Sequence, residues 1–158
     1  MALARTYSVA LVGVRGHLIE VEADIASGLP ATILVGLPDT ALREARDRIR
    51  AAIVNSGEDW PSSKITVGLS PAALPKRGSG FDLAIAVAIL AAAEAVPLDA
   101  PAGKMFLAEL GLDGRLRRLA ALWLSAHGIR FDQIRIDVVG LLCDGAGGYT
   151  VEHVRGVG

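Results

Sequence analysis

Residues 81–95 read FDLAIAVAILAAAEA, an almost wholly apolar stretch that dictates how the rest of the chain must be arranged. A helix that is apolar on nearly every side has to be buried over most of its surface. Pro97 and Pro101 follow and end the predicted helix. We therefore expect neighbouring segments to cover it.

The segments before this helix read mainly as strands. Residues 7–14 form a short β-type run, and residues 18–25 alternate apolar with acidic side chains, which places Glu20, Glu22 and Asp24 on a solvated face. Gly16 lies between the two runs and suggests a hairpin. Further strands are predicted at 32–35, apolar enough to be central, at 64–69, and at 104–110 with a turn at 112–114.

A second helix is predicted to start at Asp39, which can cap it, and to stop at residues 55–57. Its inward stripe at helical spacing is Leu42, Ala45, Ile49, Ala52 and Ile53. The pairs Arg43–Asp47 and Glu44–Arg48 lie four residues apart on the outer face.

The character of the chain changes after Gly114. Residues 1–114 hold ten basic and thirteen acidic side chains, a net charge of −3, and residues 115–158 hold six and four, a net charge of +2. The second part predicts a short helix at 116–127, a strand at 134–142, a turn at 145–148 and a strand at 149–154. The chain therefore divides into 1–114 and 115–158.

Composition narrows the class of protein. The 158 residues are 52% apolar and 21% charged with a net charge of −1, as in soluble globular proteins, and they lack the strong basic excess of many nucleic-acid-binding domains. One cysteine cannot form an internal disulfide. No apolar run approaches the roughly 20 residues that span a bilayer. We expect a cytoplasmic domain without membrane contact.

Motifs for catalysis are sparse. The phosphate-binding pattern GxxxxGK[ST] is missing. The loop 76–80 opens a helix, so it either holds an anion there or is a solvated turn. Ser79 and Lys76 suggest a Ser–Lys pair, against which a structural loop is the simpler interpretation. His17, His127 and His153 are far apart, so we expect no metal and no cofactor.

Residues 5–114 resemble the N-terminal domain of magnesium chelatase-like AAA+ ATPases of the ComM/YifB type. The resemblance is carried by ordered matches at residues 4–8, 21–25, 33–39, 44–53, 64–67, 70–72, 75–86 and 109–116. It implies an α/β (α+β) fold, with a ribosomal-protein-S5-domain-2-like sheet and helices packed on it, related to the Lon protease domain.

The same resemblance limits the chemistry that we expect. A Lon-type protease places its Ser in the loop resembling 75–80 and its Lys beyond the stretch resembling 111–116, but no lysine follows Lys104 here. The family's nucleotide-binding motor follows this domain, and its motif is absent from this sequence. Proteolysis and ATP hydrolysis are therefore not expected.

Residues 115–124, 136–140 and 152–158 look like the C-terminal end of the YraN-type family, which is similar to nucleases. The carboxylates and lysine presumed to bind metal in that family lie in a part that has no counterpart here. We expect residues 115–158 to pack on the same body as residues 1–114.

These observations predict a non-catalytic N-terminal module whose partners are an AAA+ motor domain or DNA, in a family linked to DNA processing. The alternatives are a YraN-type nuclease-like protein without its active-site part, or a weak DNA-binding module. The candidate contacts to an anion or nucleic acid are Lys76, Arg77, Gly78, Ser79, Arg43, Arg46 and Arg50. A solvated helix face is the simpler interpretation of the arginines.

Overall fold

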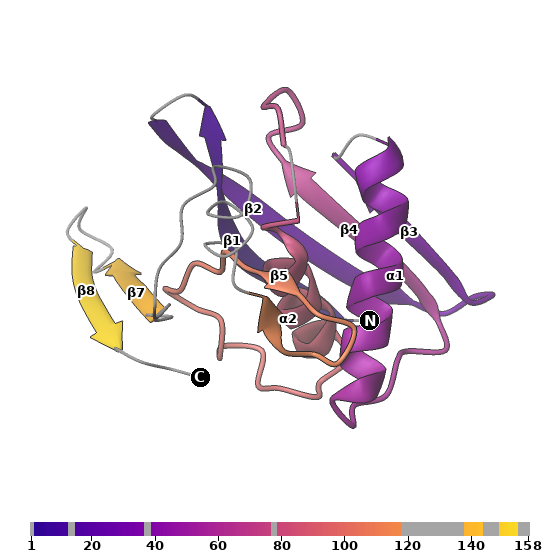
Figure 1. Cartoon of the computed structure of the whole chain (residues 1–158). Coiled ribbons are helices and arrows are strands. Elements are labelled where there is room, and N and C mark those ends of the chain that lie inside the picture. The colour runs from indigo at the N-terminus through magenta and orange to yellow at the C-terminus, as the bar shows by residue number, and fades with distance from the viewer. Residues whose placement is uncertain are drawn as a thin grey trace, which may run out of the picture.

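A four-stranded sheet forms one layer of the protein, and two helices cover one of its faces (Figure 1). The computed structural model describes residues 2–12, 15–36, 39–76, 79–117, 138–143 and 149–154. The strand order is β1 (Ala2–Val12), β2 (Arg15–Ala26), β4 (Lys64–Ser70) and β3 (Ala31–Val35). Within this sheet β3 and β4 pair in parallel, with α1 (Asp39–Asn55) crossing between them, and the other neighbours pair antiparallel.

Strand β2 confirms the alternation predicted from the sequence. Ile19, Val21 and Ala23 are fully buried beneath the helices, and the acidic side chains between them lie on the opposite, partly exposed face. The predicted hairpin is also confirmed, with β1 and β2 pairing from Val12↔Arg15 onward. Gly16 therefore lies inside β2 and not in the turn.

The prediction that residues 32–35 form a central strand is wrong, because β3 is the edge strand next to β4. Thr32 and Leu34 are half-buried on the helix side, but Ile33 and Val35 are 41% and 54% exposed on the open face. The strand is apolar on both faces although only one face is covered, so hydropathy alone misplaced it.

Helix α1 has the predicted bounds at both ends, and Ala45, Ile49, Ala52 and Ile53 are buried as expected. The side chains of Asp39 and Leu42 lie outside the described residues. The Glu44–Arg48 pair is present at 3.8 Å, whereas the Asp47 carboxylate pairs with Arg46 at 3.0 Å in place of the predicted Arg43.

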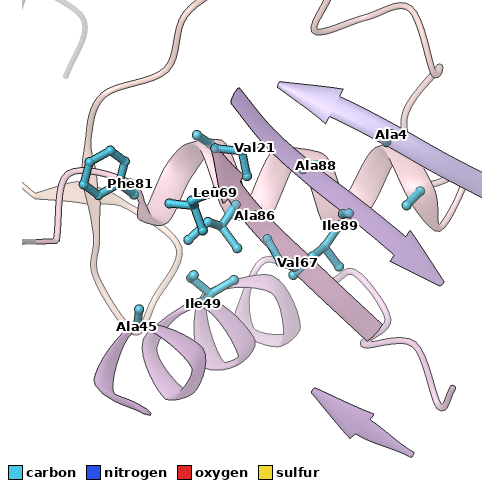
Figure 2. Packing of buried hydrophobic residues seen from close by; sticks show 14 of the residues in the cluster. Ala4, Val21, Ala45, Ile49, Val67, Leu69, Phe81, Ala86, Ala88 and Ile89 are labelled. Atoms are coloured by element: carbon cyan, nitrogen blue, oxygen red, sulfur yellow. The ribbon is translucent and has the colours of Figure 1, made fainter. Parts of the chain in front are cut away.

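Helix α2 (Asp82–Ala92) is buried along almost its whole length, which confirms the prediction from its apolar sequence. Figure 2 shows Ile49 of α1, Ala86 and Ile89 of α2, and Val67 and Leu69 of β4 in one cluster. Thr6 of β1 adds a polar link, since its hydroxyl donates to the Ala84 carbonyl at 2.9 Å. Both helices and the sheet thus share a single core.

Helix α2 ends at Ala92, five residues before Pro97, and a left-handed turn follows at Glu94, where φ is 61°. The Glu94 and Ala95 amides donate to the Ala91 and Leu90 carbonyls, which is a Schellman motif. This position favours glycine, because a Cβ atom in the left-handed region crowds the following carbonyl.

We expect Glu94→Gly to stabilise the protein by about 1 kcal/mol, because glycine removes the Cβ strain at a left-handed helix end. Urea unfolding followed by circular dichroism measures the change. Glu94→Ala removes the same charge but keeps a Cβ atom, so it is the matched control. A gain of equal size in Glu94→Ala would show that the charge, and not the backbone conformation, is responsible.

The segment after α2 returns to the edge of β1 and then forms a small hairpin. Of the strand predicted at 104–110, only a bridge between Tyr7 and Met105 and the strand β5 (Glu109–Leu110) are present. The predicted turn at 112–114 is confirmed, and the Asn55 amide ties it to α1 by donating to the Leu112 carbonyl at 2.6 Å.

The predicted helix at 116–127 is wrong at its start. Leu116 and Arg117 form strand β6, which pairs with β5 through Leu110↔Leu116 and Glu109↔Arg117. Main-chain pairing across a short turn overrides the helical spacing of the leucines. Residues 118–127 lie outside the described residues.

A second hairpin is formed by β7 (Val138–Cys143) and β8 (Tyr149–Val154). The predicted strand at 149–154 is confirmed, and the strand predicted at 134–142 is confirmed from Val138 onward. The start of that strand and the turn at 145–148 lie outside the described residues. Among the described helices, none combines the length and apolar character needed to cross a membrane.

Candidate functional site at the start of helix α2

Polar side chains from four elements make contacts at the start of α2 and in the loop before it. Lys76 and Ser79 come from the loop before the helix, Asp82 opens the helix, Arg48 reaches over from α1, and Glu109 comes from β5. Arg77 and Gly78, both candidates from the sequence, lie outside the described residues. The contacts of the other five show what this cluster does.

Lys76 is 1% exposed although its ammonium group carries a charge. Its Nζ donates to the carbonyl oxygens of Pro71 and Leu74, at 2.6 and 3.3 Å. Burial lowers the pKa of Lys76 below its ordinary value, because the charged form loses water. The loop that contains Lys76 therefore folds around the ammonium group, which it binds through these two carbonyls.

We expect Lys76→Met to lower the free energy of unfolding by about 1–3 kcal/mol, because two carbonyls lose their donor. The lowered pKa gives this effect a pH dependence. Between the folded pKa and the ordinary value of 10.5, the unfolded chain binds the proton more readily, so Lys76 contributes more stability as pH rises.

The measurement is urea unfolding of both proteins at neutral pH and near pH 10. The loss caused by Lys76→Met should be larger at the higher pH. Lys104→Met is the control, because Lys104 also donates to one carbonyl, of Ala100, but is exposed. Equal losses in the two variants would contradict a structural role for the buried lysine.

Ser79 is bonded to a carboxylate and not to the lysine. Its hydroxyl donates to the Glu109 carboxylate, which joins the loop to β5. In the Ser–Lys arrangement weighed above, Lys76 would have to accept the Ser79 proton. The described contacts instead engage both side chains separately, so this geometry favours the structural-loop interpretation.

The strongest pair in the cluster, Arg48 with Asp82, was not predicted. The Arg48 Nε and Nη2 atoms donate to the two Asp82 carboxylate oxygens at 2.8 and 3.2 Å, and the Leu110 amide approaches the carboxylate at 3.4 Å. Asp82 is 1% exposed and Arg48 is 22% exposed. The pair therefore joins α1, α2 and β5 at one buried point.

Desolvation raises the pKa of Asp82 above its ordinary value, and this outweighs the lowering by the Arg48 guanidinium.

One sequence signal could have indicated the site. Asp82 is the only charged residue in the apolar run before Glu94, and Arg48 directly precedes the buried Ile49. Both positions border the core, where a charge needs a partner.

The start of α2 already holds carboxylates of its own. The positive end of the helix dipole stabilises negative charge, and Asp82 lies in its first turn with Glu109 nearby. A bound anion would have to compete with these groups. The electrostatics thus favour a helix start that is closed by the protein's own side chains.

The three arginines predicted as nucleic-acid contacts are placed away from this cluster. Arg43, Arg46 and Arg50 are exposed along α1, and Arg46 pairs with Asp47. In the described part of the chain, no three His, Cys, Asp or Glu side chains gather as metal ligands.

The sequence of this α/β domain matches a known family. The description of that family is subunit ChlI of Mg-chelatase, and the match covers residues 21–139. The chain belongs to the ChlI family. The matched range continues past Gly114, where the sequence changes character.

Individual relatives agree with this assignment. The chain is 40% identical to protein YifB of Escherichia coli over 99% of its own length and 47% identical to competence protein ComM of Haemophilus influenzae over 82%. It is 53% identical to an uncharacterised protein of Mycobacterium tuberculosis over 74%. The chain spans 32%, 24% and 23% of these three proteins, respectively.

A short C-terminal segment has a second similarity. Over 44 residues the chain is 57% identical to a UPF0102 protein of Beutenbergia cavernae, of which it covers 37%. This finding bears out the YraN-type resemblance noted from the sequence.

Proposed function

We propose that this chain is a non-catalytic interaction module of a ComM/YifB-type magnesium chelatase-like ATPase. The observation that carries the proposal is the closed cluster at the start of α2. Lys76 donates to its own loop, Ser79 to Glu109, and Arg48 to Asp82. These contacts hold the loop, α2 and the β5–β6 hairpin together. We therefore place the function in the surface of the domain and not in a reactive centre.

The finer architecture is part of the proposal. A β1–β2 hairpin, a β3–α1–β4 crossover and α2 on the same sheet face support a ribosomal-protein-S5-domain-2-like fold related to the Lon protease domain. We propose segments 1–114 and 115–158 on one body, which the pairing of β5 with β6 across the boundary supports. Cytoplasmic DNA processing is proposed from the competence protein among its relatives.

The test uses the purified chain and the rest of the E. coli YifB protein, expressed without the part that the chain matches. We expect the two to co-elute in size-exclusion chromatography, and the chain alone to show no ATP turnover with Mg²⁺. Separate elution would contradict the interaction module. ATP turnover by the chain alone would contradict the non-catalytic assignment.

A weak DNA-binding module is the second candidate, favoured by the exposed guanidinium groups of Arg43, Arg46 and Arg50 on α1. Contacts of this kind go to phosphates, so binding would weaken steeply with salt. We expect the triple Gln variant to abolish gel retardation of a DNA duplex at low salt. Retention of the shift in that variant would exclude these arginines as the contact.

A further inference from the structure

We infer that the outer edge of β3, together with Arg43, Arg46 and Arg50 of α1, binds an acidic segment in extended conformation that adds to the sheet as a strand. We call this surface the β3–arginine edge. The inference deepens the proposed function, because it says where an interaction module makes contact and with what chemistry.

The edge offers main-chain pairing. In the described part of the chain, no strand lies on the outer side of β3. Successive residues of a strand direct their amide and carbonyl groups to alternate sides, so those facing away from β4 are free for a partner strand. Ala31–Val35 carries no charge, proline or glycine, the devices that usually block such an edge.

Ile33 and Val35 add apolar contact to this pairing. They lie on the open face, opposite Thr66 and Gly68 of β4, and are half exposed. Gly68 has no side chain to cover Val35. An added strand with apolar side chains at alternate positions would cover both residues, because side chains on one face of neighbouring strands lie next to each other.

The orientation of α1 about its own axis places Arg46 and Arg50 on the side toward this edge. Arg48 faces α2, as its contact with Asp82 shows. Arg46 and Arg50 are each two residues away, roughly 200° around the helix axis, and therefore lie on the opposite flank. Figure 1 shows α1 between α2 and the β3 side of the sheet, so this flank overlooks β3.

The charge of this flank of α1 indicates which kind of ligand the edge favours. Arg43 lies on the same flank, and among the described side chains Asp47 is the acidic residue paired within it, with Arg46 at 3.0 Å. The net charge of the flank is therefore positive, which favours carboxylates. Guanidinium groups bind a carboxylate through two parallel hydrogen bonds. A second copy of this chain is disfavoured, because pairing β3 with β3 about a twofold axis would bring the two arginine flanks together.

A nucleic acid is the other polyanion to consider. Its phosphates would engage the arginines but would leave the main chain of β3 and the exposed Ile33 and Val35 without partners. Strand addition uses all three features, since main-chain bonds provide affinity and alternate side chains provide specificity. The observations therefore favour an acidic extended peptide.

The test measures fluorescence anisotropy with a short labelled peptide that alternates glutamate and valine. We expect saturable binding at low salt. The same peptide N-methylated at alternate residues, which cannot pair as a strand, should bind at least about tenfold more weakly, and so should its glutamine version. No binding, or equal binding of the N-methylated peptide, would overturn the inference.

Protein variants test the arginine flank. Arg46→Glu/Arg50→Glu should weaken binding at least about tenfold, and Lys104→Glu/Arg115→Glu makes the same charge change at exposed positions elsewhere. Equal effects of the two would overturn the inference, as would a single-stranded oligonucleotide that displaces the peptide and binds more tightly. If the chain co-elutes with the YifB remainder but does not bind the peptide, only the inference about the β3–arginine edge is refuted. If it binds the peptide but does not co-elute, only the proposed function is refuted.

Discussion

Arg48→Met is expected to lower the free energy of unfolding by about 3 kcal/mol at neutral pH, because it leaves a buried carboxylate without its partner. Asp82 is 1% exposed, and Arg48 supplies both of its side-chain donors, at 2.8 and 3.2 Å. The Leu110 amide at 3.4 Å is the one described donor that remains to the carboxylate. Urea unfolding followed by circular dichroism measures the loss.

The loss should depend on pH in a defined direction. The pKa of Asp82 is already raised in the folded protein, so its contribution to stability is full below its ordinary value of 3.8 and declines as pH rises through the folded pKa. Removing Arg48 removes two influences that lower this pKa and so raises it further. The difference between the variant and the original protein should therefore shrink below about pH 4.

Two controls separate the buried pair from charge in general. Arg46→Met removes an exposed arginine from the same helix and should cost less than about 0.5 kcal/mol. Adding Asp82→Asn to Arg48→Met should recover most of the loss, because the amide can be buried without charge. No recovery in the double variant, together with a pH-independent loss, would contradict this account.

Gly36→Ala is expected to cost about 3 kcal/mol or more, since steric overlap adds to backbone strain. Gly36 follows β3 with φ at 97°. A Cβ atom there would lie 2.4 Å from the Leu69 carbonyl oxygen, which belongs to the backbone of β4 and cannot rotate away. Relief requires β3 to separate from β4.

Gly57→Ala is the matched control for this prediction. Gly57 lies two residues after the end of α1 with φ at 88°, but a Cβ atom there would meet nothing within 4 Å. Only the strain of the left-handed conformation applies, so we expect a loss of about 1 kcal/mol. Similar losses at the two glycines, measured by urea unfolding, would show that the close approach to β4 carries no penalty.

Periodicity predicted the elements whose side chains are sorted by one covered face. The acidic and apolar alternation of β2 and the stripe of α1 follow directly from burial on one side, and α2 is apolar because it is covered on most sides. The same rule failed at β3, because the exposed Ile33 and Val35 give its sequence the apolar pattern of a strand buried on both faces. The position of a strand within its sheet depends on pairing, which hydropathy does not report.

The candidate site was predicted only in part. The sequence identified the loop at 76–80 and the start of α2, where the structure engages Ser79 and Asp82, while Lys76 bonds within its own loop. It did not predict that Arg48 would reach Asp82, 34 residues away, because this contact depends on how α1 crosses α2. Nor did it predict the burial of Lys76, which requires the carbonyls of Pro71 and Leu74 to turn inward.

The β5–β6 hairpin spans the point at which the charge balance of the sequence changes. Leu110 is buried in the core, and the turn after it is bonded to α1 through Asn55, so contacts within residues 1–114 fix the first arm. The second arm joins through main-chain pairing at Leu116 and Arg117. Backbone hydrogen bonds do not depend on which side chain each residue carries, so the sequence of the second arm can vary without redesign of the core.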